Sequence, residues 1–431
     1  MKMLTQIAAW ASVGCVAALA SAQQADAQQD VVFLSTQLRP IEEAQKVREV
    51  ILKDFKGKVT YLVEEPSPFD VRVRAEGQAG KRTISLVGAL HGELSALQPT
   101  GNLDSLDDVV AKLTDRGIPA NLMELGKFGT GKQVYVPWMQ ATYIMVAKKE
   151  ALQYLPAGAN IDTLTYGHLE AWGKAMTDKT GKRLLGFPAG PKGLMPRFFE
   201  GYLYPSFTGG VVTPFRSPEA ETMWTQFKSL WRYVNPNSTS YDFMQEPLMG
   251  GEVWVAFDHV ARVKEALVQM PDDFVTFPAP AGPKGRGYMP VIAGLAVPKD
   301  APNRAGAIAL IEHLTRPETQ ITTAAEVGFF PIVKAQLPAD LSPGIKLIAS
   351  AVAKTQDAKD ALPALLPVGL ADKGGEFNKV YFDTFQRIVL RNEQPRTVLD
   401  AQAAALKGIM EATKAPCWAP DKPSQGACPV N

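Results

Sequence analysis

Hydrophobic and polar residues follow two different periods over the first part of the chain. Val31 to Leu34 form a short apolar run, and apolar residues then recur at helical spacing from Ile41 to Phe55. The segment Val59 to Val63 alternates as a strand does, and Phe69 to Gln78 and Thr83 to Val87 repeat the order of helix and strand. Strands that alternate with helices predict an α/β layer with a parallel sheet.

The segments that follow two of these strands are candidate ligand contacts. STQLRP occupies residues 35–40, and GALHGE occupies residues 88–93. In parallel α/β sheets, ligands bind in the crevice at the carboxyl ends of the strands. Helical periodicity recurs later, over residues 165–179, 217–234 and 304–315, so helices continue through the second half of the chain.

The N-terminal segment has the pattern of a secretory signal peptide. Lys2 is its only charged residue before Asp26, and an apolar stretch covers residues 4–20. Small residues then suit cleavage near Ala22 or Ala27, which predicts a signal peptide over residues 1–27 and export to the periplasm. No later run approaches the ~20 apolar residues of a membrane span.

Composition and charge exclude some classes of partner. The chain has 431 residues, 46% hydrophobic and 21% charged, which is typical of a globular protein of two or three domains. Its formal net charge of +1 provides no basic field, so we expect no nucleic-acid partner. Cys417 and Cys428 lie in the Pro-rich tail 416–431, and an oxidising compartment predicts a disulfide between them.

The run GKFGTGKQVYVPW at residues 126–138 places two glycines and Lys132 almost at the spacing of a phosphate-binding loop. Such a loop needs Ser or Thr after the lysine and must open a helix, but Gln133 and a β-branched segment follow here. The four histidines show no metal-ligand spacing, and no G-x-S-x-G elbow is present. We therefore expect no cofactor, no metal and no catalytic step.

Several ordered blocks resemble a known family. They are GKQVYVPW, DTLTYGHLEAWGKAMTDKTGKRLLGFP, PLMGGEVWVAFDHVARV, TFPAPAGPKGRGYMPVIAGLAVPKDAPN and VGFFPIVKA, and they span the chain from about Val31 to beyond Val398. In this order they are similar to the extracellular solute-binding proteins of ABC importers, in the sugar-binding family that includes maltose-binding protein. Tyr166 departs from the family, which usually has Trp there.

The resemblance implies the α/β periplasmic binding protein type II fold. Two lobes, each a mixed sheet flanked by helices, would enclose a ligand cleft and close on the ligand by a hinge motion. The first lobe would hold residues 28–143 plus 294–343, and the second 144–292 plus 344–415. A monomer that delivers its ligand to the transmembrane permease subunits is implied.

Sugars present apolar faces and many hydroxyl groups, so a cleft that binds them needs aromatic platforms and multi-point hydrogen bonders. Mapping the contact segments of the family onto this chain gives twelve candidates. They are Gln37, Arg39, Glu42, His91, Trp138, Gln140, Tyr143, Arg197, Trp254, Asp258, His259 and Gly294. The aromatic residues Phe198, Phe199, Tyr202 and Tyr204 are expected mainly in the core.

The ligand class stays open at this level. Asp258 and Glu42 suit a neutral sugar or polyol, whereas Arg39, Arg197 and Arg262, if they converge, suit a sugar acid, sulfonate or phosphodiester. A polyamine or iron carrier would need a cleft rich in carboxylates or paired tyrosines. A secreted hydrolase would need a nucleophile or an acid/base pair, and a ligand-sensing subunit of a receptor would share the fold.

Overall fold

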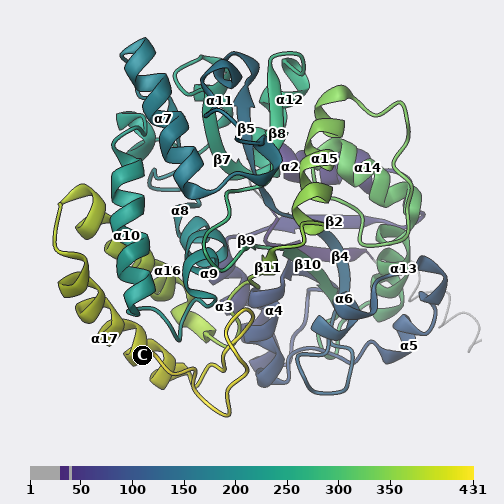
Figure 1. Ribbon diagram of the computed structural model, residues 1–431. Coiled ribbons are helices and arrows are strands. Elements are labelled where there is room, and N and C mark those ends of the chain that lie inside the picture. Colours follow the sequence, from purple (N-terminus) through teal and green to yellow (C-terminus); the bar gives the residue numbers. More distant parts are fainter. Residues whose placement is uncertain (1–29, 38–40) are drawn as a thin grey trace, which may run out of the picture.

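The computed structural model describes residues 30–37 and 41–431, and two β-sheets with flanking helices form its framework (Figure 1). The predicted signal peptide 1–27 and the candidate Arg39 lie outside the described residues. Within the described part of the chain, no helix is both long and apolar enough to cross a membrane.

The first sheet is mixed and contains the three strands predicted near the N-terminus. Its order is β2-β1-β3-β10-β4, in which β1 pairs in parallel with β2 and β3, and β10 runs antiparallel between β3 and β4. The strands are β1 (Val31–Ser35), β2 (Val59–Val63), β3 (Leu86–Leu90), β4 (Val136–Ala141) and β10 (Val291–Ala296). The parallel pairing predicted from the periodicity is confirmed for β1, β2 and β3.

Short helices surround this sheet. They are α2 (Ile41–Lys46), η1 (Val47–Ile51), α3 (Pro66–Gln78), α4 (His91–Leu97), η2 (Gln98–Thr100), α5 (Asp107–Val110), η3 (Thr114–Arg116), α6 (Ala120–Leu125), α13 (Arg304–Leu314) and α14 (Pro317–Val327). Helix α4 starts where β3 ends, so its first residues lie at the carboxyl edge of the parallel strands. We call this part lobe 1.

The second sheet is also mixed, with order β6-β7-β5-β8. Strand β5 is antiparallel to β7 and β8, and β6 is parallel to β7. The strands are β5 (Tyr143–Lys148), β6 (Leu185–Gly186), β7 (Val255–His259) and β8 (Phe274–Phe277); β9 (Arg286–Tyr288) and β11 (Ala361–Pro363) form a separate short ladder.

The remaining helices pack around this second sheet and form lobe 2 with it (Figure 1). They are η4 (Lys149–Tyr154), η5 (Ile161–Thr163), α7 (Tyr166–Thr180), α8 (Met195–Phe198), η6 (Phe199–Leu203), α9 (Tyr204–Thr208), α10 (Pro218–Trp231), η7 (Pro236–Thr239), α11 (Gln245–Met249), α12 (Val260–Gln269), α15 (Pro343–Gln356), η8 (Ala371–Lys373), α16 (Gly374–Phe385), η9 (Gln386–Leu390) and α17 (Pro395–Thr413).

Local signals explain where the predicted helices α7 and α10 begin and end. The Thr165 hydroxyl accepts the His168 amide at the start of α7, and Gly181 ends that helix with φ 71°. Ser217 caps α10 by accepting the Ala220 amide. Side-chain oxygens at these positions satisfy amides that have no partner within the helix, so the helices predicted at 165–179 and 217–234 are confirmed to within a few residues.

The chain crosses between the sheets at Thr142, which separates β4 from β5. The Thr142 hydroxyl contacts the carbonyl of Met289 at 2.9 Å and the Tyr202 hydroxyl at 3.0 Å. Met289 precedes β10, which returns the chain to the first sheet. Both crossings are therefore held together by side-chain hydrogen bonds.

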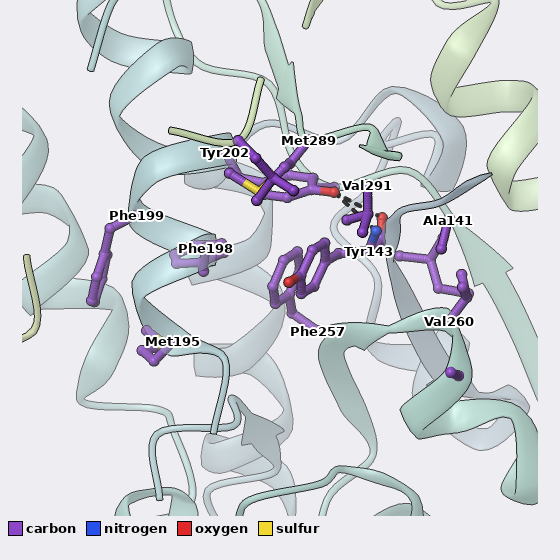
Figure 2. Packing of buried hydrophobic residues seen from close by; sticks show 14 of the residues in the cluster. Ala141, Tyr143, Met195, Phe198, Phe199, Tyr202, Phe257, Val260, Met289 and Val291 are labelled. Atoms are coloured by element: carbon purple, nitrogen blue, oxygen red, sulfur yellow. Dashed lines mark hydrogen bonds between the residues drawn. The ribbon is translucent and has the colours of Figure 1, made fainter. Parts of the chain in front are cut away.

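A cluster of buried aromatic residues lies directly behind this crossing (Figure 2). The Tyr143 and Phe257 rings are parallel at 5.5 Å, and Tyr202 and Phe198 each lie 4.8 Å from Phe257. The Tyr202 hydroxyl accepts the Tyr143 amide at 3.0 Å. Phe198, Phe199, Tyr202 and Tyr204 are all completely buried, which confirms their expected place in the core.

The C-terminal tail is fastened to lobe 2. Cys417 and Cys428 form a disulfide, and Asp421 accepts the backbone amides of residues 211–213 at 2.7–3.0 Å. The tail also holds the segment before α16, because the Leu365 amide donates to the Ala419 carbonyl at 3.0 Å. This segment reaches lobe 1, where the Gly369 amide contacts the Ser95 hydroxyl of α4 at 3.4 Å.

Candidate ligand-binding cleft

Polar side chains from both lobes meet beside the crossing at Thr142. Lobe 1 contributes the segment after β1, the helix α2 and the start of α4. Lobe 2 contributes the end of β7, the helices α8 and α12, and the segment before α16. We call these two surfaces the lobe-1 wall and the lobe-2 wall.

The segment after β1 turns into the lobe-1 wall, as its place at the carboxyl end of a parallel strand predicts. Gln37 is buried, and its carbonyl accepts the Tyr61 hydroxyl at 3.2 Å. The Thr36 hydroxyl donates to Glu93 at 2.7 Å, and the Leu90 amide donates to the same carboxylate at 2.8 Å. Burial raises the pKa of Glu93, and these two hydrogen bonds oppose that rise.

Two adjacent glutamates on α2 differ sharply in exposure. Glu42 is exposed, whereas Glu43 is 4% exposed. Burial raises the pKa of Glu43 to about 8, against the opposing charges of Lys264 and Arg262 on α12. Its Oε1 atom has no hydrogen-bond partner among the described residues. Glu43 thus brings an unpaired carboxyl oxygen to the boundary between the lobes.

In the lobe-2 wall, Asp258 ends β7 with both carboxylate oxygens occupied. They accept the amides of Met244 at 3.0 Å and His259 at 2.7 Å. Burial raises the pKa of Asp258 to about 7, and the charge of Arg262 opposes the rise. Carboxylates that accept backbone amides are held in one orientation, so this part of the wall is rigid.

Arg262 is held just as firmly. Its Nη1 donates to the carbonyls of Lys192 at 3.2 Å and Asp242 at 3.0 Å, and its guanidinium lies 4.5 Å from the centre of the Phe243 ring. Three different interactions therefore fix one cation, which is 6% exposed, at the start of α12.

His259 joins the two walls. Its ring lies 5.1 Å from the Tyr143 ring and 5.6 Å from the ring of Phe329, which follows α14 in lobe 1. Burial, with a smaller contribution from Arg262, lowers the pKa of His259 to about 3, so the ring is neutral at pH 7. Burial also raises the pKa of Tyr143, which keeps its hydroxyl protonated.

An interlobe cavity of about 470 Å³ extends the cleft beyond this group. Glu93 and Leu90 line it from lobe 1, and Arg197 and Leu366 line it from lobe 2. Arg197 pairs with Glu200 at 2.7 Å, and Glu200 is 1% exposed. The cationic head of Arg197 is thus compensated within its own lobe.

A sequence profile described as bacterial extracellular solute-binding protein matches residues 53–346. The chain belongs to this family. Members of the bacterial extracellular solute-binding family are binding proteins that act outside the cytoplasm. A comparison with curated protein sequences finds no significant match.

Solved structures share the two-lobed fold. The GacH receptor of Streptomyces glaucescens, solved unliganded and with acarbose, aligns with a TM-score of 0.71 and 17% identity, covering 90% of this chain and 100% of that chain. Maltose-bound MalE3 of T. maritima gives 0.71 and 17%, covering 88% and 99%. UgpB from Mycobacterium tuberculosis with glycerophosphocholine gives 0.68 and 15%, covering 89% and 99%. These similarities establish the fold.

Five of the candidates predicted from the sequence lie in the lobe-1 wall or the lobe-2 wall. They are Gln37, Tyr143, Arg197, Asp258 and His259. Gln140 lies nearby and is half-buried, with its side-chain amide donating to the Pro331 carbonyl at 2.9 Å.

Trp254 lies at the end of β7 opposite to His259, away from the two walls. It adjoins the first residue of β7, where its carbonyl accepts the Lys148 amide, and its ring lies 6.2 Å from Tyr154. The antiparallel pairing with β5 places His259 at the opposite end of the strand. Alternation along the strand predicts Trp254 and Asp258 on one face, but the length of the strand separates them.

Trp138 lies across the first sheet instead of standing free in the cleft. Its ring is 0% exposed and lies 5.6 Å from Phe33. Gly88 makes room for both rings, because a Cβ there would be 2.8 Å from Phe33 and 3.1 Å from Trp138. The indole Nε1 has no partner within the described part of the chain. As a stacking platform for the ligand, Trp138 stays a prediction.

The two remaining candidates, His91 and Gly294, serve the packing of lobe 1. The His91 ring contacts the Tyr135 hydroxyl at 2.8 Å and stacks on Phe128, and burial lowers its pKa to about 4. Gly294 makes room for the Tyr135 ring, with which a Cβ would collide. The glycine therefore accommodates a side chain here, where the family resemblance implied close approach of the ligand.

Sequence reasoning missed Glu43 and Glu93 as parts of the wall. A signal for Glu43 was present, because residues 43, 47 and 51 recur every four positions and share the face that buries Val47 and Ile51. Glu42, chosen instead, precedes this face by one position.

Proposed function

We propose that this protein is the periplasmic binding component of an ABC importer, which captures a carbohydrate or polyol in the interlobe cleft and delivers it to the membrane permease. The observation that carries the proposal is that buried polar side chains of the two lobes face each other, Glu43 with Arg262 and Glu93 with Arg197. Such a group suits a small ligand that presents hydroxyl groups in several directions.

The charge of the cleft favours a neutral ligand over an anion. Arg197 is paired with Glu200, and Arg262 donates to two carbonyls. A bound sulfonate or phosphodiester needs cations with free donors. The charge of Arg197 is instead balanced by Glu200, and Glu43 and Glu93 add carboxyl groups opposite the arginines, so a sugar or polyol fits better than a sugar acid.

We propose that ligand capture involves no chemical step. The Asp258 carboxylate is held in one orientation by two backbone amides, which suits a fixed acceptor for a ligand hydroxyl. The ligand contacts on this proposal are Gln37, Tyr143, Arg197, Asp258 and His259 from the sequence prediction, with Glu43, Glu93 and Arg262 added.

The division of the chain also belongs to the proposal. The first lobe holds residues 28–143 plus 294–343, and the second 144–292 plus 344–415, with the tail 416–431 attached to the second. Pairing of β4 with β10 and of β5 with β7 supports a boundary near residue 143.

A thermal-shift screen tests the proposal. A true ligand at a hundred times its Kd adds ~2.7 kcal/mol to the free energy of unfolding, so a clear rise in Tm is expected with a neutral sugar or polyol. Calorimetry then measures the affinity. A shift with phosphodiesters, sugar acids or polyamines, and none with neutral sugars or polyols, would refute the assignment.

A further inference from the structure

Glu43 has a buried carboxyl oxygen that nothing in the described structure satisfies. Its side chain lies on α2 and is 4% exposed. Buried polar atoms are almost always hydrogen-bonded, because leaving one unpaired costs the full desolvation of that atom. An orphan oxygen on α2, opposite Arg262 and Lys264 of the other lobe, therefore points to a group that arrives with the ligand.

The charged and titratable groups around Glu43 come from five elements, its own helix included. Arg262 and Lys264 face it from α12, and Tyr61 faces it from β2. Arg48 of η1 lies over the Tyr61 ring at 5.5 Å, and Glu326 of α14 is paired with Lys46 of α2 at 2.7 Å. Among the described residues, Glu43 forms no ion pair with any of these groups, although two cations lie on the opposite wall.

Burial is the strongest influence on this carboxyl group and outweighs both cations, so that its pKa rises to about 8. At pH 7 the neutral form predominates. A neutral carboxyl group both donates and accepts a hydrogen bond, whereas a carboxylate only accepts. This matches a hydroxyl group, which also does both, and does not match an anion.

We propose that Glu43 is a specificity-determining residue, whose neutral carboxyl group donates a hydrogen bond to one ligand hydroxyl and accepts one from a neighbouring hydroxyl. The inference rests on the proposed function, since it requires a hydroxyl-rich ligand between the lobes. Glu43 selects ligands that carry hydroxyl groups at this position, because an analogue without them leaves the buried carboxyl group unpaired.

Thermal unfolding without ligand tests the orphan oxygen directly. Glu43→Met replaces the carboxyl with an apolar side chain of similar length, and Glu43→Gln keeps a neutral donor and acceptor. The matched control is Glu42→Gln, on the exposed neighbour. We expect the Tm of Glu43→Met to equal or exceed that of the wild type. A fall of several degrees would show that Glu43 serves the fold and would overturn the inference.

Ligand affinity tests the recognition. Maltose, D-galactose and D-sorbitol are the probes, measured by thermal shift and calorimetry on the full mature chain at pH 7. For a probe that binds the wild type, we expect Glu43→Met to weaken binding at least tenfold, Glu43→Gln to stay within about threefold, and Glu42→Gln to match the wild type. Unchanged affinity in Glu43→Met overturns the role of Glu43 alone. If no neutral sugar or polyol binds the wild type, the proposed function itself fails.

The pH dependence separates a neutral carboxyl group from a carboxylate. If the neutral form binds, affinity falls as pH rises from 7 to 9 through the pKa of about 8, and Glu43→Gln removes that fall. Affinity that rises over the same interval, in the wild type but not in Glu43→Gln, would show that the carboxylate binds and would overturn the inference.

Discussion

Asp258 and Arg262 in the lobe-2 wall and Glu43 in the lobe-1 wall differ in how completely their hydrogen bonds are satisfied. In the lobe-2 wall, Asp258 accepts two amides and Arg262 donates to two carbonyls. In the lobe-1 wall, Glu43 keeps a buried oxygen without a partner in the described residues. The Asp258 and Arg262 side chains are therefore held in place before the ligand arrives, whereas Glu43 keeps one oxygen for it. Glu200, the lobe-2 partner of Arg197, also keeps one buried oxygen without a partner among the described residues.

The walls also differ in charge. Lobe 1 supplies the carboxyl groups of Glu43 and Glu93, and lobe 2 supplies the cations Arg262 and Lys264. A direct link exists beside them, because the Lys264 ammonium donates to the Glu326 carbonyl of lobe 1 at 2.5 Å. This hydrogen bond joins the two lobes close to Glu43, whose carboxyl group is itself neutral at pH 7.

The largest loss of stability is expected in the aromatic cluster that packs against the lobe-2 wall. Phe257 is completely buried against Tyr143, Tyr202 and Phe198. Phe257→Ala should lower the free energy of unfolding by about 3–5 kcal/mol, as measured by urea denaturation. Val268→Ala, at a 39% exposed position, is the control and should change it little. A loss below about 1 kcal/mol would mean that the rigid wall does not depend on this core.

The disulfide comes next, because the tail holds the segment that lines the cavity. Cys417 and Cys428 are 11 positions apart, and opening so short a loop costs about 2–3 kcal/mol in the chain-entropy view. We expect the double variant with serine at both positions to unfold at lower urea concentration while keeping its ligand affinity within a few-fold. A large loss of affinity would show that the ligand-binding geometry of the lobe-2 wall depends on the disulfide-bonded tail.

Removing the acceptor that orders the end of β7 should have a somewhat smaller effect. Asp258→Ala leaves the amides of Met244 and His259 without their partner, which costs about 1–3 kcal/mol. Denaturation measures the stability, and calorimetry should show a ligand affinity at least tenfold weaker. Asp272→Ala, on an exposed residue, is the comparison. Equal behaviour of the two variants contradicts an organised wall.

Stability should depend on pH in opposite directions for the carboxyl groups and the histidines. Burial raises the pKa of Glu43 to about 8 and of Asp258 to about 7, so their contributions are full below their ordinary values and are lost as pH rises toward 8. Burial lowers the pKa of His91 to about 4 and of His259 to about 3, so their contributions are lost as pH falls below 6.5.

Calorimetric scans should thus show the highest Tm near pH 5–6, with a fall of roughly 1–3 °C by pH 8. The fall should shrink in Glu43→Gln, which cannot titrate. A flat profile from pH 5 to 8 in the wild type argues that Glu43 and Asp258 are solvated in solution.

The smallest effect is expected at the far end of the lobe-2 sheet. Trp254 lies beside Tyr154, at the end of β7 away from His259. Trp254→Ala should leave ligand affinity unchanged within twofold, even if it lowers stability. Calorimetry decides, and a tenfold loss would return Trp254 to the binding site.

Much of the framework was predictable from local patterns. Strand periodicity in β1, β2 and β3 and the capping residues of α7 and α10 depend on residues close together in the chain. These elements can therefore be predicted from the sequence. The ordered motifs similarly predicted a family that the profile match confirms. By contrast, the mixed order of the first sheet depends on β10, which inserts between β3 and β4 from about 150 residues later in the chain.

The sequence by itself determined the local elements, the family and the presence of polar residues at strand ends. Only the tertiary structure decided which of those residues reach the cleft. Helical periodicity sets the faces of α2, but the packing of the lobes makes Glu43 a buried wall residue and leaves Glu42 in solvent. Likewise Trp138 and Trp254 both belong to segments with strand periodicity. The tertiary structure buries Trp138 against Phe33 across the first sheet, and it places Trp254 at the end of β7 away from His259.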